Sequence, residues 1–87
     1  MLRINAKKEG EKIKVLYLEG KICQGWIREL ELEINKGIEG GEKVSLDFSK
    51  VSYVDEQAAE MLNQPPLKEL EKRNCSLFIR TMLNMEG

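Results

Sequence analysis

The stretch that most constrains the fold lies at residues 43–62, where a strand pattern passes into a helix pattern. Apolar and polar residues alternate over 44–49, which is the two-residue period of a β-strand. Asp55 then precedes a segment suited to a helix, and a short carboxylate there can accept hydrogen bonds from the first free N–H groups. The stretch therefore predicts a buried strand, a short connection and a helix over 56–62 that Asp55 caps.

The segments before this stretch predict a hairpin and a long helix. Residues 2–4 form a short alternating strand, and the polar residues 5–12 form the hairpin connection. The strand over 13–18 has apolar residues on both faces, which predicts a place inside the sheet, and Glu19-Gly20 ends it. The helix over 24–36 ends at Gly37 and has one apolar face, formed by Trp26, Ile27, Leu30 and Ile34.

The segments after it predict a further helix and a last strand. Pro65-Pro66 interrupts the helix pattern, and Pro66 suits the start of a new helix over 67–73. Alternation over 75–83 predicts the last strand, followed by a tail over 84–87. The expected fold class is α/β (α+β-like), with elements in the order β-β-α-β-α-β. We expect one domain over 1–87, with a single mixed sheet of about four strands and helices mainly on one face.

Composition excludes several classes of function. A chain of 87 residues supplies one domain, and its net charge of −1 gives no electrostatic case for nucleic acid. No apolar run is long enough to span a membrane and no signal peptide is evident, so we expect no direct membrane insertion and a cytoplasmic location. The chain has no histidine, and its two cysteines have no CxxC partner. We therefore expect no metal site and no cofactor.

Catalytic patterns are also missing. The sequence has no GxxxxGKS/T loop and no GxGxxG motif. Asp47 falls on the polar side of its strand, and Asp55 has a sufficient role as a helix cap, so this pair is not expected to perform acid–base chemistry. Cys23 lacks a histidine that would activate it. We expect a protein that is not an enzyme.

Three segments carry a family resemblance: VLYLEGKI at 15–22, KVSLDFSKVSYVD at 43–55, and SLFIR after the charged segment. Together they resemble a STAS domain, the fold of bacterial anti-sigma-factor antagonists and of the cytoplasmic tail of sulfate transporters. The resemblance implies a mixed sheet with helices mainly on one face. It also implies a non-catalytic module that docks on partner proteins through the start of its second long helix.

The resemblance places the partner-binding surface around the start of the helix over 56–62. The family's Asp-Ser-Ser-Gly is replaced here by Asp55-Glu56-Gln57-Ala58, and the serine that is phosphorylated in the family aligns with Gln57. Because phosphorylation adds about −1.5 to −2 charges at such a site, losing the acceptor removes that switch. The expected partner-binding residues are Ser52, Asp55, Glu56, Gln57, Ala58 and Glu60.

Three functions remain open at this point. The first is an anti-sigma-factor antagonist that binds a kinase-like anti-sigma factor in signalling and transcription regulation, without serine phosphorylation. The second is a small STAS subunit of an ABC-type lipid-asymmetry transporter, bound to the ATPase subunit. The third, of a different class, is a small-ligand or nucleotide-binding domain. The family continues with another helix after its last strand, whereas this chain stops at Gly87, so we expect apolar surface left open there for a partner or a homodimer.

Overall fold

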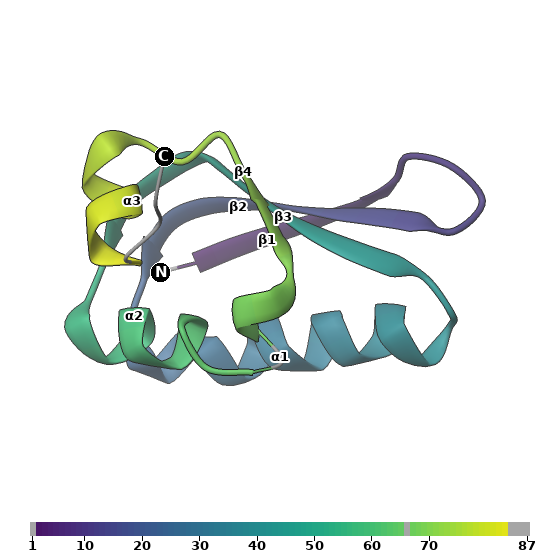
Figure 1. Cartoon of the computed structure of the whole chain (residues 1–87), viewed down its shortest axis with the longest axis horizontal. Helices are drawn as coiled ribbons and strands as arrows, with labels where there is room; N and C mark the ends of the chain where they lie inside the picture. Colours follow the sequence, from purple (N-terminus) through teal and green to yellow (C-terminus); the bar gives the residue numbers. More distant parts are fainter. Residues whose placement is uncertain (1, 66, 84–87) are drawn as a thin grey trace.

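Apolar residues on the two longest strands build the centre of a four-stranded mixed sheet (Figure 1). The computed structural model describes residues 2–65 and 67–83. Its elements are β1 (Leu2–Lys8), β2 (Ile13–Ile22), α1 (Gln24–Glu39), β3 (Lys43–Val54), α2 (Glu56–Leu62), the 3₁₀ turn η1 (Leu67–Glu69), β4 (Glu71–Arg73) and α3 (Leu77–Met82). The strand order is β1-β2-β3-β4, with β1 antiparallel to β2 and the other pairs parallel. The predicted fold class is confirmed.

The strands are longer than the sequence pattern predicts. β1 continues through the predicted hairpin connection to Lys8, and β2 continues past Glu19-Gly20 to Ile22. β3 continues to Val54 with no break at the predicted short connection, because its second half still pairs with β2. Two register shifts in the β2–β3 pairing lie beside Gly20, whose φ of 102° suits glycine. The polar residues that suggested strand ends do not end the strands, because backbone hydrogen bonding to the neighbouring strand continues through them.

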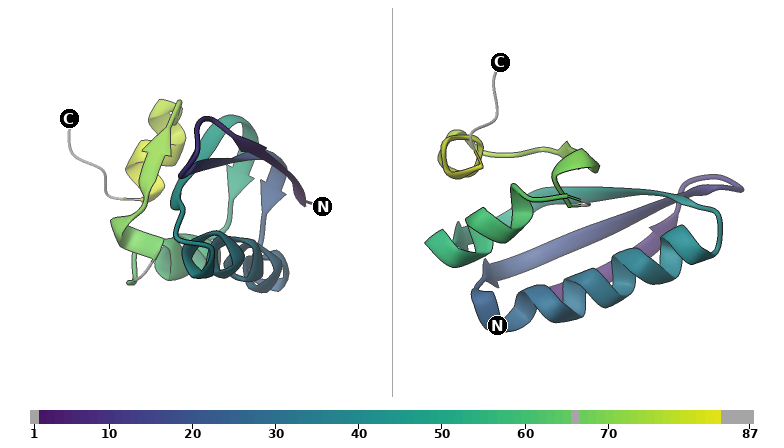
Figure 2. Two further views of the ribbon diagram at one scale, coloured as in Figure 1. Left: turned by 90° about the vertical axis from the view of Figure 1, so that its right-hand side faces the viewer. Right: turned by 60° about the horizontal axis from the view of Figure 1, so that its bottom comes forward.

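α1 and α2 cover one side of the sheet, and the core lies between them and the strands (Figures 1 and 2). The predicted apolar face of α1 is confirmed: Ile27, Leu30 and Ile34 are buried, and Trp26 packs partly against the core. None of the helices in the described residues is long and apolar enough to cross a membrane.

Gly37 lies inside α1 rather than at its end, because the helix continues to Glu39. A Cβ atom at Gly37 would lie 2.6 Å from Val44 Cγ2, and Val44 is buried in β3. Gly37 therefore allows α1 to approach the sheet closely at this point.

Replacing Gly37 by alanine is expected to lower the free energy of unfolding by about 1–2 kcal/mol, because the clash with Val44 outweighs the better helix propensity of alanine. The matched control is Gly25→Ala in the first turn of the same helix, where no atom lies within 4 Å of the new Cβ. That change should be neutral or stabilising by up to about 1 kcal/mol. Urea denaturation compares the two variants, and equal stabilities would show that α1 does not approach Val44 this closely.

The C-terminal third contains the largest departures from the prediction. The predicted helix over 67–73 is wrong: it is η1 followed by β4, which pairs with residues 45–47 of β3. Lys72 explains why η1 ends at Glu69 and does not continue as the predicted helix. Its Nζ donates to the carbonyl oxygens of Leu67 (3.0 Å), Lys68 and Leu70. An ammonium that binds these free carbonyls takes the place of further helical hydrogen bonds.

The predicted strand over 75–83 is also wrong, because this segment forms α3. The Ser76 side chain accepts a hydrogen bond from the Ile79 N–H at 3.2 Å, and Ile79 and Leu83 lie four residues apart and are buried. A helix therefore does follow the last strand, which the sequence analysis did not expect. Pro66 and the predicted tail over 84–87 lie outside the described residues.

Candidate functional site

Asp55 fixes the start of α2 at the end of the sheet. Its backbone is extended, and its Oδ1 accepts a hydrogen bond from the Ala58 N–H at 2.7 Å. Its own N–H donates to the Ile22 carbonyl oxygen at 3.0 Å, which joins the cap to the end of β2. The predicted capping role of Asp55 is confirmed, and the cap determines where the side chains that follow it point.

The other predicted site residues divide into exposed and buried groups. Glu56, Gln57 and Glu60 are exposed on α2. Ser52 is exposed at the end of β3, and its Oγ donates to the Gly20 carbonyl oxygen at 3.3 Å. Ala58 is 0% exposed, so its side chain belongs to the core and offers a partner no contact.

Two carboxylates of α2 lie one helical turn apart. Glu56 and Glu60 are in an i, i+4 relation on the exposed face, and neither forms an ion pair with a described residue. Like charges at this spacing cost an isolated helix about 0.2–0.5 kcal/mol. The negative charges of Glu56 and Glu60, beside the Asp55 cap, are therefore not offset by ion pairs within the described residues.

An apolar patch that the sequence analysis did not identify lies where β3 meets α3. Figure 1 shows α3 at the same end of the sheet as α2. It consists of Tyr53 on β3 and of Leu77 and Phe78 on α3. The rings of Tyr53 and Phe78 stack with their centroids 6.0 Å apart and an interplanar angle of 22°. The exposed fractions are 44% for Tyr53, 46% for Phe78 and 81% for Leu77. Aromatic and aliphatic side chains that remain exposed together are typical of protein interaction sites.

A local signal for α3 was present in the sequence. Ser76 is a good N-cap residue, and Ile79, Met82 and Leu83 have the i, i+3, i+4 spacing of a helix. The three consecutive apolar residues Leu77, Phe78 and Ile79 instead favoured a strand. With the helical pattern recognised, neither Leu77 nor Phe78 falls on the buried face that contains Ile79.

The groups considered for catalysis have structural partners. Asp47 is 5% exposed rather than on a polar strand face; its Oδ1 accepts from the Ser49 N–H at 2.9 Å and its Oδ2 from Asn74 Nδ2 at 2.8 Å. Burial alone would raise the pKa of this carboxyl, but hydrogen bonds from Ser49 and Asn74 together with nearby Arg73 hold the pKa below its ordinary value. The interactions of Asp47 therefore hold the sheet and the β4–α3 connection together.

The thiols and carboxylates do not assemble into a reactive or metal-binding group in the described residues. Cys23 and Cys75 are free and half-buried, and burial raises the pKa of the Cys75 thiol. Within residues 2–65 and 67–83, no three cysteine, aspartate or glutamate side chains are close enough together to hold a metal ion.

Comparisons with known proteins agree with the architecture. The family model described as the STAS domain matches residues 4–83. Among solved structures, the chain is similar to the anti-sigma-factor antagonist SpoIIAA in its unphosphorylated form, with a TM-score of 0.72 and 13% sequence identity over 94% of this chain and 78% of that one. At this identity the likeness shows a shared fold. No curated protein matches the sequence.

Proposed function

Because this chain belongs to the STAS domain family, we propose that it is a non-catalytic module of the anti-sigma-factor-antagonist kind, which binds a partner protein through one end of its sheet. The observation that carries the proposal is the apolar patch of Tyr53, Leu77 and Phe78 beside the exposed acidic face of α2. A complementary partner presents apolar side chains to the patch and basic side chains to Glu56 and Glu60.

The proposed interaction does not depend on serine phosphorylation. Gln57 is exposed at the position that aligns with the family's phosphorylated serine, and an amide side chain cannot accept a phosphoryl group. Ser52 is the nearest serine in the sequence before α2, and its hydroxyl hydrogen-bonds the Gly20 carbonyl oxygen. The proposed docking surface therefore has the carboxylates of Glu56 and Glu60 in place of a phosphorylation switch.

The partner itself is proposed to be a kinase-like anti-sigma factor in the cytoplasm of a bacterial cell. The tagged chain is purified from its native host as wild type, as a Leu77→Ser, Phe78→Ser double variant, and as a Glu11→Lys, Glu39→Lys control. Glu11 lies in the connection between β1 and β2, and Glu39 is the last residue of α1. Figure 1 shows both of these segments at the end of the sheet away from α2 and α3. The proposal expects one kinase-like protein with wild type and control that is lost with the patch variant.

Two results would contradict this proposal. The same partner set with the patch variant would place the docking surface elsewhere. A transporter ATPase recovered from the membrane fraction, in place of an anti-sigma factor, would assign the chain to the lipid-asymmetry alternative.

Glu60→Lys is expected to weaken binding of the purified partner at least about tenfold, because it reverses a charge in the docking surface. The same change should leave the free energy of unfolding unchanged or raise it by up to about 0.5 kcal/mol, since Glu56 and the introduced lysine would then form a favourable i, i+4 pair. Calorimetric titration measures the affinity, and urea denaturation measures the stability. Loss of binding accompanied by loss of stability would instead indicate damage to α2.

A further inference from the structure

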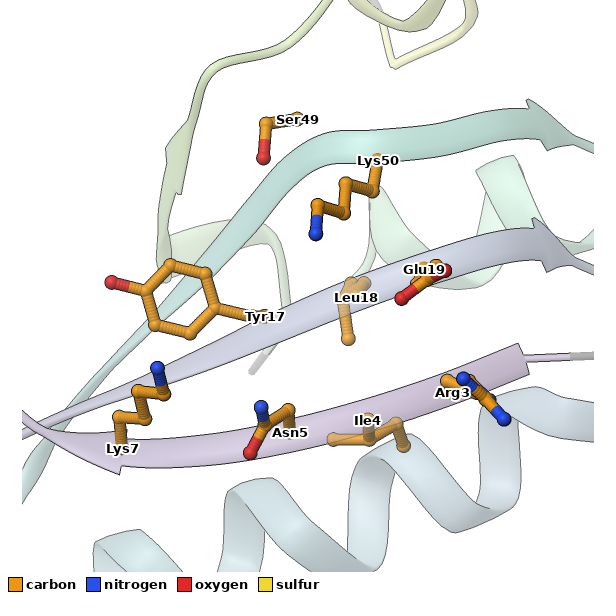
Figure 3. A pocket seen from close by; sticks show the side chains of 9 residues that line it. All are labelled: Arg3, Ile4, Asn5, Lys7, Tyr17, Leu18, Glu19, Ser49 and Lys50. Carbon is orange, nitrogen blue, oxygen red and sulfur yellow. The ribbon is translucent and has the colours of Figure 1, made fainter.

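The face of the sheet turned away from α1 carries a basic depression of about 620 Å³ over β1, β2 and β3 (Figure 3). Figure 3 shows its polar side chains standing in front of the strands, with α1 behind them. The side chains used in the argument are Arg3, Asn5 and Lys7 from β1, Tyr17 and Glu19 from β2, and Lys50 from β3. The volume falls within the roughly 300–1,000 Å³ that small-molecule sites occupy.

Strand register explains why residues far apart in sequence meet here. Arg3 pairs with Glu19 across β1 and β2, and Glu19 pairs with Lys50 across β2 and β3. Asn5 pairs with Tyr17 in the next row on the same face. The depression is thus carried by paired strands, which hold its side chains on a rigid base rather than on a loop.

The basic depression has an excess of positive charge. Three cationic side chains, Arg3, Lys7 and Lys50, surround a single carboxylate, that of Glu19. The chain as a whole has a net charge of −1. None of the three cations forms an ion pair with a described residue, whereas Lys8, Lys14 and Arg73 all do. Positive charge is therefore concentrated in this depression, and ion pairs within the described residues do not offset it.

The donors of the depression converge around an aromatic ring. Lys7 Nζ lies 5.7 Å from the centroid of the Tyr17 ring, a cation–π contact that restricts the lysine. In Figure 3 the ammonium group of Lys7 points towards the Tyr17 ring, and that of Lys50 points from β3 towards β2. A flat apolar group can rest beside Tyr17, while an anionic group accepts hydrogen bonds from the two lysines.

We propose that the basic depression binds a small phosphate monoester with an aromatic ring. Lys7 and Lys50 hold the phosphoryl oxygens, the ring packs beside Tyr17, and Glu19 limits the affinity by repelling the anion. This ligand site lies on the sheet face, separate from the apolar patch and the acidic face of α2. The test of this ligand site does not depend on whether the proposed partner binds.

Phenyl phosphate is the probe, titrated into the isotopically labelled full chain while amide chemical shifts are followed. Saturable shifts are expected in β1, in β2 around Tyr17 and in β3 around Lys50. Lys7→Gln, Lys50→Gln should weaken binding at least about tenfold, because two charged donors are lost. The matched control, Lys12→Gln, Lys68→Gln, removes the same charge from exposed positions outside the depression and should stay within about twofold of wild type.

Two further variants test the roles of single residues. Glu19→Gln should tighten binding severalfold, and a gain of affinity cannot result from failure to fold. Tyr17→Leu should reduce the affinity for phenyl phosphate more than the affinity for inorganic phosphate. The proposal is overturned if wild type shows no saturable shifts, or if the lysine variant and its control bind equally. It is also overturned if inorganic phosphate binds as tightly as phenyl phosphate, because the ring would then contribute nothing.

Discussion

Replacing Ile79 by alanine is expected to lower the free energy of unfolding by about 3 kcal/mol, as measured by urea denaturation. Ile79 is 0% exposed and belongs to the core cluster that also contains Leu62 of α2 and Leu83. Truncating it removes apolar contacts and leaves a cavity between α3 and the rest of the core. The loss is a large fraction of the roughly 5–15 kcal/mol that stabilises a domain of ordinary size.

The informative control is Leu77→Ala, which should cost less than about 0.5 kcal/mol because Leu77 is 81% exposed. A strand over 75–83 would place Leu77 and Ile79 on the same face and make the two substitutions similar in cost. In a helix the side chains of Leu77 and Ile79 point to different faces, as their exposed fractions indicate. If both variants lowered the free energy of unfolding by a similar amount, the segment would be a strand. Leu77 would then not belong to an exposed apolar patch.

Replacing Asp47 by alanine is expected to lower the free energy of unfolding by about 2–3 kcal/mol near neutral pH, because two hydrogen bonds to a charged acceptor are lost. One of them holds Asn74, which has a φ of 56° in the connection between β4 and α3. Without the carboxylate, this left-handed conformation has less to stabilise it. An exposed carboxylate, that of Glu11, provides the matched control: Glu11→Ala should be almost neutral.

The effect of Asp47 should depend on pH. Its pKa is lower in the folded protein than in the unfolded chain, so the unfolded chain takes up the proton first as the pH falls. The stabilisation is therefore fully present above the unfolded pKa and is lost as the pH falls through the lower pKa of the folded protein. The stability difference between wild type and Asp47→Ala should be smaller at about pH 3 than at about pH 6. A difference that grows on acidification would show that Asp47 is not the stabilised carboxylate.

Local signals predicted the parts of the fold that depend on neighbouring residues. Asp55 as a cap and the helix that follows it were predictable, because capping is determined within three residues. The apolar face of α1 was predictable from its spacing for the same reason. Asp55 lies directly before the exposed carboxylates of α2, so the acidic part of the proposed docking surface was predictable from the sequence, whereas its apolar patch was not.

The remaining features depend on residues distant in sequence. Asp47 looked solvent-exposed because its alternation is that of a half-buried strand, but Asn74 and the β4 pairing bury its side of β3. Tyr53 and Phe78 meet only because α3 returns to the end of β3. The basic depression requires the register of three strands, which no short segment specifies.

The two outer strands carry a further consequence for how the molecule behaves at high concentration. β4 has only three residues, so that edge offers little unpaired backbone to another chain. β1 is longer, but an antiparallel pairing with a second β1 centred on Asn5 would place Arg3 of each copy opposite Lys7 of the other. Like charges directly opposite one another disfavour such a pairing. The sheet is therefore protected at both edges against edge-to-edge aggregation, even though it leaves apolar side chains exposed at one end.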